Sequence, residues 1–144
     1  MRPTSEPLIV RVLARAASYR DEVTDLTRRL VAIPTENPPG DGYAPCLTAV
    51  AEELDGVGLA PRRVEDCLLG GHGSGTPVVY FHGHYDVVPA QRKEQFEPRL
   101  RLGRLYGRGT ADMKGGLAAM ILAVRVLKDL GVYPKVDDPG RPIK

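Results

Sequence analysis

The stretches that decide the fold are residues 77–89, PVVYFHGHYDVVP, and residues 105–116, LYGRGTADMKGG. The run PVVYF at 77–81 is rich in β-branched and aromatic residues, which predicts a buried strand. In the second stretch, glycines and other small residues surround Asp112 immediately before a long apolar run, as in a tight turn into a helix. A strand with helices before and after it in the sequence indicates an α/β fold.

Four helices are predicted around these stretches from apolar residues at helical spacing. Ser18 is a candidate N-cap for the second helix, and Gly131 is a candidate left-handed cap after the last one. The last helix is apolar nearly all round, so we expect it to be covered on more than one side. The predicted helices span residues 8–16, 23–33, 47–54 and 115–130, and the alternative for the first two is one helix with a joint.

Short β elements complete the predicted architecture. Residues 62–65 form a candidate strand, and leucines alternating with arginines over 100–106 predict a hairpin. The polar residues 91–99 are expected to form an exposed loop. We therefore expect a partial α/β domain, with a short sheet made by 77–81 and the hairpin and covered by the last helix.

Composition excludes several classes of protein. The 144 residues carry a net charge of +2, from 20 basic and 18 acidic residues without long runs, which argues against a nucleic-acid or membrane-surface partner. Arginines interrupt the apolar N-terminal residues where a signal peptide needs an unbroken stretch, and no run is long enough to span a bilayer. Cys46 and Cys67 lack metal-knuckle spacing and are expected to be reduced thiols of a cytoplasmic protein.

His84 and Asp86 stand two residues apart at the end of the predicted strand, so an extended backbone directs both side chains to one face. A zinc-binding histidine usually donates its second ring N–H to a carboxylate, and Asp86 is within reach of that role. The alternative is an ordinary histidine at a strand end and a turn aspartate. These two residues alone do not decide between the two interpretations.

Asp112 stands in a glycine-rich turn before the last predicted helix. The end of a strand in an α/β sheet is where ligands collect, and a carboxylate there can bridge two cations. Two metal ions about 3.5–4 Å apart can share a water and acidify it toward neutrality. The alternative role is the N-cap of the helix, and the two roles are compatible.

Taken together, HYDVVP at 84–89 and LYGRGTADMKGG at 105–116 resemble the two signatures of a dinuclear zinc peptidase and deacylase family. Its members include acetylornithine deacetylase, succinyl-diaminopimelate desuccinylase, aminoacylase and carboxypeptidase G. The loop PTENPPGDGY at 34–43 is similar to the loop after the first helix of that family, and the resemblance covers residues 19–135. It implies the N-terminal part of a zinc aminopeptidase-like catalytic domain, a mixed sheet with flanking helices. It also implies hydrolysis of amide bonds in N-acyl amino acids or small peptides.

The same resemblance implies roles for single residues. His84 would bind one metal ion, Asp112 would bridge both ions, and Asp86 would be the catalytic residue that orients His84. The cofactor would be Zn²⁺, two ions per complete site, with Co²⁺ as an alternative. A cis peptide bond between Asp112 and Met113 is implied as well.

Other polar residues are weaker candidates. His82 lies on the same side of the predicted strand as His84 but is not used by the family signature, and His72 is expected to be solvated. Lys114 and Arg108 flank Asp112 and would either balance its charge or lie at the surface. Three arginines of the predicted hairpin would attract an anionic substrate or, in the better interpretation, form a solvated face; they are Arg99, Arg101 and Arg104.

The sequence also departs from the family pattern. The resemblance implies a Glu-Glu pair that holds the general base and a metal ligand, a further acidic ligand, a lid domain that mediates dimerisation and a late histidine, none of which has a match here. Glu52 and Glu53 lie upstream and are expected to form a solvated helix face. We therefore expect a truncated or frameshifted product with a helical extension (1–17), a partial catalytic domain (18–135) and a divergent tail (136–144).

Two alternative functions follow from this departure. One is an inactive fragment that persists as a binding module or an unstable remnant. The other is one half of a split enzyme that acts with a complementary chain. The expected partner in the enzymatic interpretation is a small-molecule substrate, and because family members are often dimeric, self-association through an exposed sheet edge is also expected.

Overall fold

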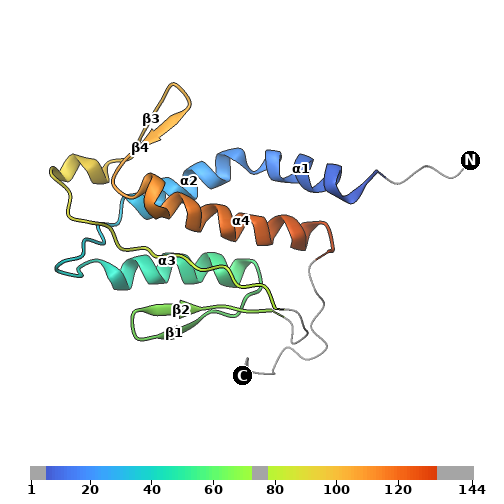
Figure 1. The fold of residues 1–144 in the computed structure, drawn as a ribbon, viewed down its shortest axis with the longest axis horizontal. Coiled ribbons are helices and arrows are strands. Elements are labelled where there is room, and N and C mark those ends of the chain that lie inside the picture. Colours follow the sequence, from blue (N-terminus) through green and yellow to red (C-terminus); the bar gives the residue numbers. More distant parts are fainter. Residues whose placement is uncertain (1–5, 73–77, 133–144) are drawn as a thin grey trace, which may run out of the picture.

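The computed structural model describes residues 6–72 and 78–132 and is built around four helices (Figure 1). Helices are present where apolar spacing predicted them, and left-handed Gly131 (φ +67°) follows the last one. The predicted divergent tail, residues 136–144, lies outside the described residues. The helices are α1 (Leu8–Ser18), α2 (Arg20–Val31), α3 (Tyr43–Gly56) and α4 (Gly115–Asp129).

Helices α1 and α2 are separated by a joint at Tyr19. The predicted N-cap role of Ser18 is wrong, because Tyr19 occupies the N-cap position of α2 and caps it with no side-chain hydrogen bond. The Ser18 hydroxyl instead donates back to the carbonyl of Arg15 at 2.7 Å. Tyr19 and Arg15 both contact Asp129 of α4, so this joint is tied to the end of the last helix.

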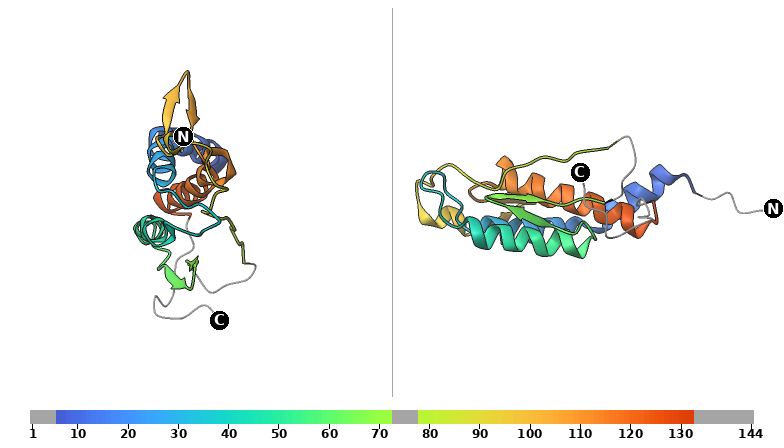
Figure 2. Two further views of the ribbon diagram at one scale, coloured as in Figure 1. Left: turned by 90° about the vertical axis from the view of Figure 1, so that its left-hand side faces the viewer. Right: turned by 90° about the horizontal axis from the view of Figure 1, so that it is seen from below.

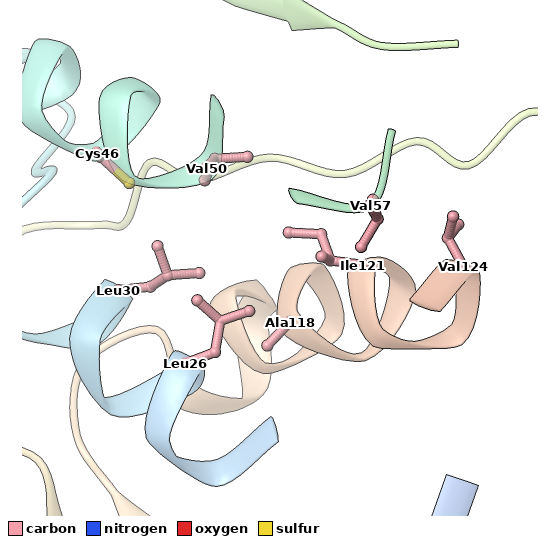
Figure 3. Packing of buried hydrophobic residues seen from close by; sticks show 8 residues of the cluster. All are labelled: Leu26, Leu30, Cys46, Val50, Val57, Ala118, Ile121 and Val124. Atoms are coloured by element: carbon pink, nitrogen blue, oxygen red, sulfur yellow. The ribbon is translucent and has the colours of Figure 1, made fainter. Parts of the chain in front are cut away.

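The hydrophobic core lies among α2, α3 and α4 (Figure 3). Each helix contributes the apolar residues of one face, as its spacing requires. Val57, directly after α3, also belongs to the core, and it is fully buried. The cluster consists of Leu26, Leu30, Cys46, Val50, Val57, Ala118, Ile121 and Val124.

In the described residues, the strands form two antiparallel hairpins on opposite sides of the helices (Figures 1 and 2). In the first, β1 (Arg62–Val64) pairs with β2 (Cys67–Leu69). In the second, β3 (Arg99–Arg101) pairs with β4 (Arg104–Tyr106), as the leucine and arginine alternation predicted. The fold thus combines helices with small sheets, in agreement with the expected α/β class.

Two local predictions are wrong. Residues 78–81 do not form a buried strand: they pair with no other strand within the described ranges, and Val79 and Tyr80 are 76% and 83% exposed. The composition favours a strand, but a strand also needs a neighbour to bond with. Residues 91–99 are also not wholly irregular, since Lys93–Phe96 forms a short 3₁₀ turn, η1. No helix in the described ranges is long and apolar enough to cross a membrane.

Candidate metal site

The segment that carries His84 and Asp86 is held by the loop after α2. Val87 N–H donates to the carbonyl of Thr35 at 2.8 Å, and Asn37 N–H donates to the carbonyl of Val87 at 2.9 Å. The Thr35 hydroxyl donates to the carbonyl of Tyr85 at 2.6 Å. These bonds surround the parallel bridge between Glu36 and Val87 and fix the backbone at and after Tyr85.

A glycine allows the same segment to lie directly on α4. A Cβ atom at Gly83 would come within 2.7 Å of Leu117 Cδ2 and 2.9 Å of Met120 Cε, distances that real Cβ atoms do not adopt. Because these atoms are the ends of flexible side chains, any larger residue at position 83 would require Leu117 and Met120 to shift. As a result, His84 lies beside the turn that leads into α4.

That turn, η2 (Thr110–Lys114), presents Asp112 at the same place. It is not regular helix, because Asp112 (φ −128°, ψ 99°) is extended, and the Asp112–Met113 peptide bond is cis, as the resemblance implied. Gly109 precedes the turn with φ +83°, a conformation that favours glycine. A Cβ there would also lie 2.6 Å from Val87 Cγ1, so the two loops touch at this glycine.

The structure brings His84, Asp86 and Asp112 together. His84 Nδ1 lies 3.1 Å from Asp86 Oδ1, and His84 Nε2 lies 3.0 Å from Asp112 Oδ1. The imidazole is thus held between two carboxylates, one at each ring nitrogen. The side chain of Asp112 is 85% exposed, whereas that of Asp86 is 36% exposed, so the Asp112 side of the cluster is open.

Asp86 and Asp112 also determine the electrostatics of the imidazole. Partial burial alone would lower the pKa of His84, but the hydrogen bond with the backbone carbonyl of Asp86 at 3.1 Å, the hydrogen bond with the Asp112 carboxylate and the two negative charges raise that pKa above its usual 6.5. Asp86 is itself held by Asn37, whose Nδ2 donates to Asp86 Oδ2 at 3.2 Å. The cluster therefore favours a positive charge next to Asp112, whether a proton or a cation supplies it.

The arrangement fits a metal ion on one side of His84. When Nδ1 carries the ring proton and donates it to Asp86, the lone pair of Nε2 is directed at Asp112. Two ligands of tetrahedral zinc, each about 2.0–2.1 Å from the ion, are roughly 3.3 Å apart, close to the observed Nε2 to Oδ1 separation. Within residues 6–72 and 78–132, however, no group of three or more His, Cys, Asp or Glu side chains is arranged to hold a metal ion.

These residues line a cavity of about 320 Å³. Both loops contribute to its wall, and Arg108 is the only lysine or arginine side chain among the described residues that line it. No glutamate is present among those lining residues. The wall is formed by Asn37, His84, Asp86–Val88 and Gly107–Asp112.

Two charged residues for which the sequence suggested a surface position are buried or paired in the structure. Lys114 is not at the surface but fully buried, and its Nζ donates to the carbonyls of Leu30 at 2.8 Å and Ile33 at 2.7 Å. Burial lowers the pKa of this ammonium group. Glu53 is likewise not solvated, since it pairs with Arg29 at 2.8 Å and with Arg125 at 3.4 Å.

The remaining weaker candidates stay outside the cluster. His82 is exposed, His72 is half-buried, and both belong to parts of the chain that do not line the cavity. The arginines of the β3–β4 hairpin do not line it either. Sequence reasoning missed Asn37 and Thr35 as supports of the site, although the Pro-rich loop that carries them was recognised as similar to a family loop.

Comparison with known proteins gives a family match over the part of the chain that contains His84, Asp86 and Asp112. Residues 80–137 match Peptidase family M20/M25/M40. Succinyl-diaminopimelate desuccinylase of Stenotrophomonas maltophilia (strain R551-3) is 42% identical over 110 residues, which cover 70% of this chain and 28% of that protein. The desuccinylase of Xanthomonas oryzae pv. oryzae (strain PXO99A) is 40% identical over 112 residues, which cover 72% of this chain and 29% of that protein. The chain thus spans less than a third of the length of these relatives.

Proposed function

Because residues 80–137 belong to peptidase family M20/M25/M40, we propose that this chain supplies one side of a metal-dependent amide-hydrolase site. The substrate class is an N-acyl amino acid or a small peptide. The observation that carries the proposal is the position of His84 between the carboxylates of Asp86 and Asp112. An ordinary histidine at a strand end has no need of a carboxylate at each nitrogen.

His84 Nε2 and Asp112 are the proposed ligands, and Zn²⁺ or Co²⁺ is the proposed ion. When bound, such an ion lowers the pKa of water and polarises the carbonyl under attack. Asp86 accepts the Nδ1 proton of His84 and fixes the tautomer and the plane of the ring, while Asn37 holds Asp86 in place. Asp112 would be the ligand shared by a pair of ions, and the exposure of its carboxylate leaves room for them.

The general base has no counterpart among the described residues of the cavity wall, which include no glutamate. A general base contributes roughly a hundred- to ten-thousand-fold to rate. Two protein ligands also leave most coordination positions open, whereas zinc sites usually have three or four protein ligands. We therefore expect weak zinc binding and no substantial turnover from these 144 residues alone.

The matched relatives named above are succinyl-diaminopimelate desuccinylases, which makes N-succinyl amino acids the first substrates to assay. We place the protein in a reducing compartment such as the cytoplasm. This is supported by Cys46 and Cys67, which are both free thiols.

The test is an assay of the 144-residue chain, alone and co-expressed with the non-matching C-terminal part of the Stenotrophomonas relative. N-succinyl and N-acetyl amino acids are supplied with Zn²⁺ or Co²⁺. We expect hydrolysis only from the pair of chains, lost in His84→Ala and retained in the exposed control His82→Ala. Substantial His84-dependent turnover by the chain alone would overturn the incomplete-site proposal. Turnover by the pair that is indifferent to His84→Ala would overturn the assignment of the ligand.

A further inference from the structure

Arg108 is the cationic side chain of the cavity, and nothing in the proposed metal chemistry uses it. Its neighbours there include the carboxylates of Asp86 and Asp112, yet neither lies within ion-pair distance of the guanidinium. Across the described parts of the chain, no other carboxylate forms an ion pair with Arg108. An arginine in a concave site without a counter-ion is a candidate for binding an anionic ligand.

The guanidinium of Arg108 also makes few hydrogen bonds with the residues that the structure describes, which likewise favours the binding of a ligand. Its Nε is shielded from solvent and has no hydrogen-bond partner among the described residues. Its Nη2 makes a single long contact, 3.5 Å from the carbonyl of Pro89. A buried polar group without a partner is uncommon in folded proteins and calls for an explanation.

The backbone of Arg108 is fixed by a hydrogen bond, although its side chain makes few hydrogen bonds. Its N–H donates to the carbonyl of Gln95 at 2.7 Å, and glycines precede and follow it in the sequence. The guanidinium is thus held on a defined stretch of backbone between the β3–β4 hairpin and Asp112. A planar guanidinium matches the two oxygens of a carboxylate, which it binds through paired N–H donors.

We propose that Arg108 binds a carboxylate of the substrate. This inference rests on the proposed function, and it names the residue that would bind the free carboxylate carried by N-acyl amino acids and small peptides. The residue acts in binding and specificity, and no proton moves to or from it. A neutral amide of the same shape would leave the guanidinium without a partner and would bind less well.

The test uses the metal-free full chain with succinate as the probe and succinamide as its neutral counterpart. Side-chain ¹H–¹⁵N NMR follows the Arg108 Nε–H signal at low ionic strength. We expect succinate, but not succinamide, to shift this signal, and we expect Arg108→Gln to weaken succinate binding at least tenfold. Arg104→Gln, on the exposed β4 strand outside the cavity, is the matched control and should bind like the unaltered chain.

Each other outcome overturns the proposal. These outcomes are no succinate binding, equal binding of succinamide, or binding unchanged in Arg108→Gln. If Arg108→Gln disturbs folding, seen by circular dichroism, Arg108→Lys replaces it and is expected to weaken binding while preserving the charge. A Zn²⁺ titration separates the two claims: Arg108→Gln should leave zinc affinity unchanged, whereas loss of zinc binding in His84→Ala tests the proposed function alone.

Discussion

Among single residues, Lys114 is fully buried and stabilises the fold through its ammonium group, a role that its place beside Asp112 in the sequence does not indicate. Its ammonium group bonds the carbonyl of Leu30, in the last turn of α2, and the carbonyl of Ile33, two residues after the helix ends. It follows Asp112 by two residues, so it ties the metal-site turn to the second helix. The favourable end of the helix dipole adds to these bonds.

Replacing Lys114 by Met keeps most of the stem volume but removes the ammonium donor, so the Ile33 carbonyl loses its bond while the Leu30 carbonyl keeps only the Ile33 N–H at 3.2 Å. We expect Lys114→Met to lower the free energy of unfolding by about 1–3 kcal/mol, measured by urea denaturation. Lys128→Met is the control, because Lys128 makes one 3.2 Å bond to the carbonyl of Gly56 at an exposed position. Equal stability of the two variants would contradict this account.

The convergence of His84, Asp86 and Asp112 could be predicted from the sequence because the two-residue spacing on an extended backbone and the glycine-rich turn both carry local information. His84 and Asp86 were expected on one face, and Asp112 was expected at the end of a turn. Lys114 and Asn37 could not be predicted, since their partners Leu30, Ile33 and Asp86 are tens of residues away in the chain. A single sequence does not record such long-range contacts.

At the scale of elements, Gly83 determines how closely the His84 segment lies on α4. We expect Gly83→Ala to destabilise the chain by about 1 kcal/mol, because the ends of the Leu117 and Met120 side chains must shift to make room for the new methyl group. It should also displace His84 and weaken zinc binding. Gly56→Ala is the control, since its nearest neighbour is 3.7 Å away and alanine favours helix. Unaltered stability and zinc affinity in Gly83→Ala would show that the close approach is not required.

The contact between Tyr19, at the joint of α1 and α2, and Asp129, at the end of α4, predicts that the stability of the chain depends on pH. The Tyr19 hydroxyl donates to Asp129, and this bond is the largest cause that holds the pKa of Asp129 below its usual 3.8, with Arg15 adding to the effect. Asp129 therefore adds stability above pH 3.8, and this contribution is lost as the pH falls through its lowered pKa. We expect Tyr19→Phe to raise the pKa of Asp129, measured by ¹³C NMR of its carboxyl carbon. No change, or an equal change in Arg20→Gln, would contradict the assignment.

The helices could be predicted because the spacing of apolar residues is a local signal. The β3–β4 hairpin could be predicted because leucines alternate with arginines on both sides of a turn at Gly103. The run at 78–81 failed as a predicted strand for a physical reason. Its residues have strand composition, but a strand exists only when another backbone segment bonds to it. Within the ranges that the structure describes, no such segment lies beside it.

At the scale of the whole molecule, that unpaired run predicts self-association. Val78–Phe81 exposes four consecutive apolar side chains, between 58% and 83% each, next to backbone groups without ladder partners. Such a segment favours pairing with another chain. We expect the chain to associate with rising concentration in sedimentation velocity, and Val79→Lys to shift it toward monomer. Leu102→Lys, at the 92% exposed hairpin tip, is the control. A monomer at every concentration would contradict this prediction.

The central claim, that His84 Nε2 and Asp112 form the metal-binding side of an amide-hydrolase site, is tested most directly by imidazole NMR. The chain has three histidines, so their ring signals can be assigned individually. On adding Zn²⁺, we predict that the Nε2 signal of His84 shifts to a metal-bound value while Nδ1 keeps its proton toward Asp86, and that Asp112→Asn weakens this shift. A shift confined to His72 or His82, with His84 unchanged, would contradict the claim.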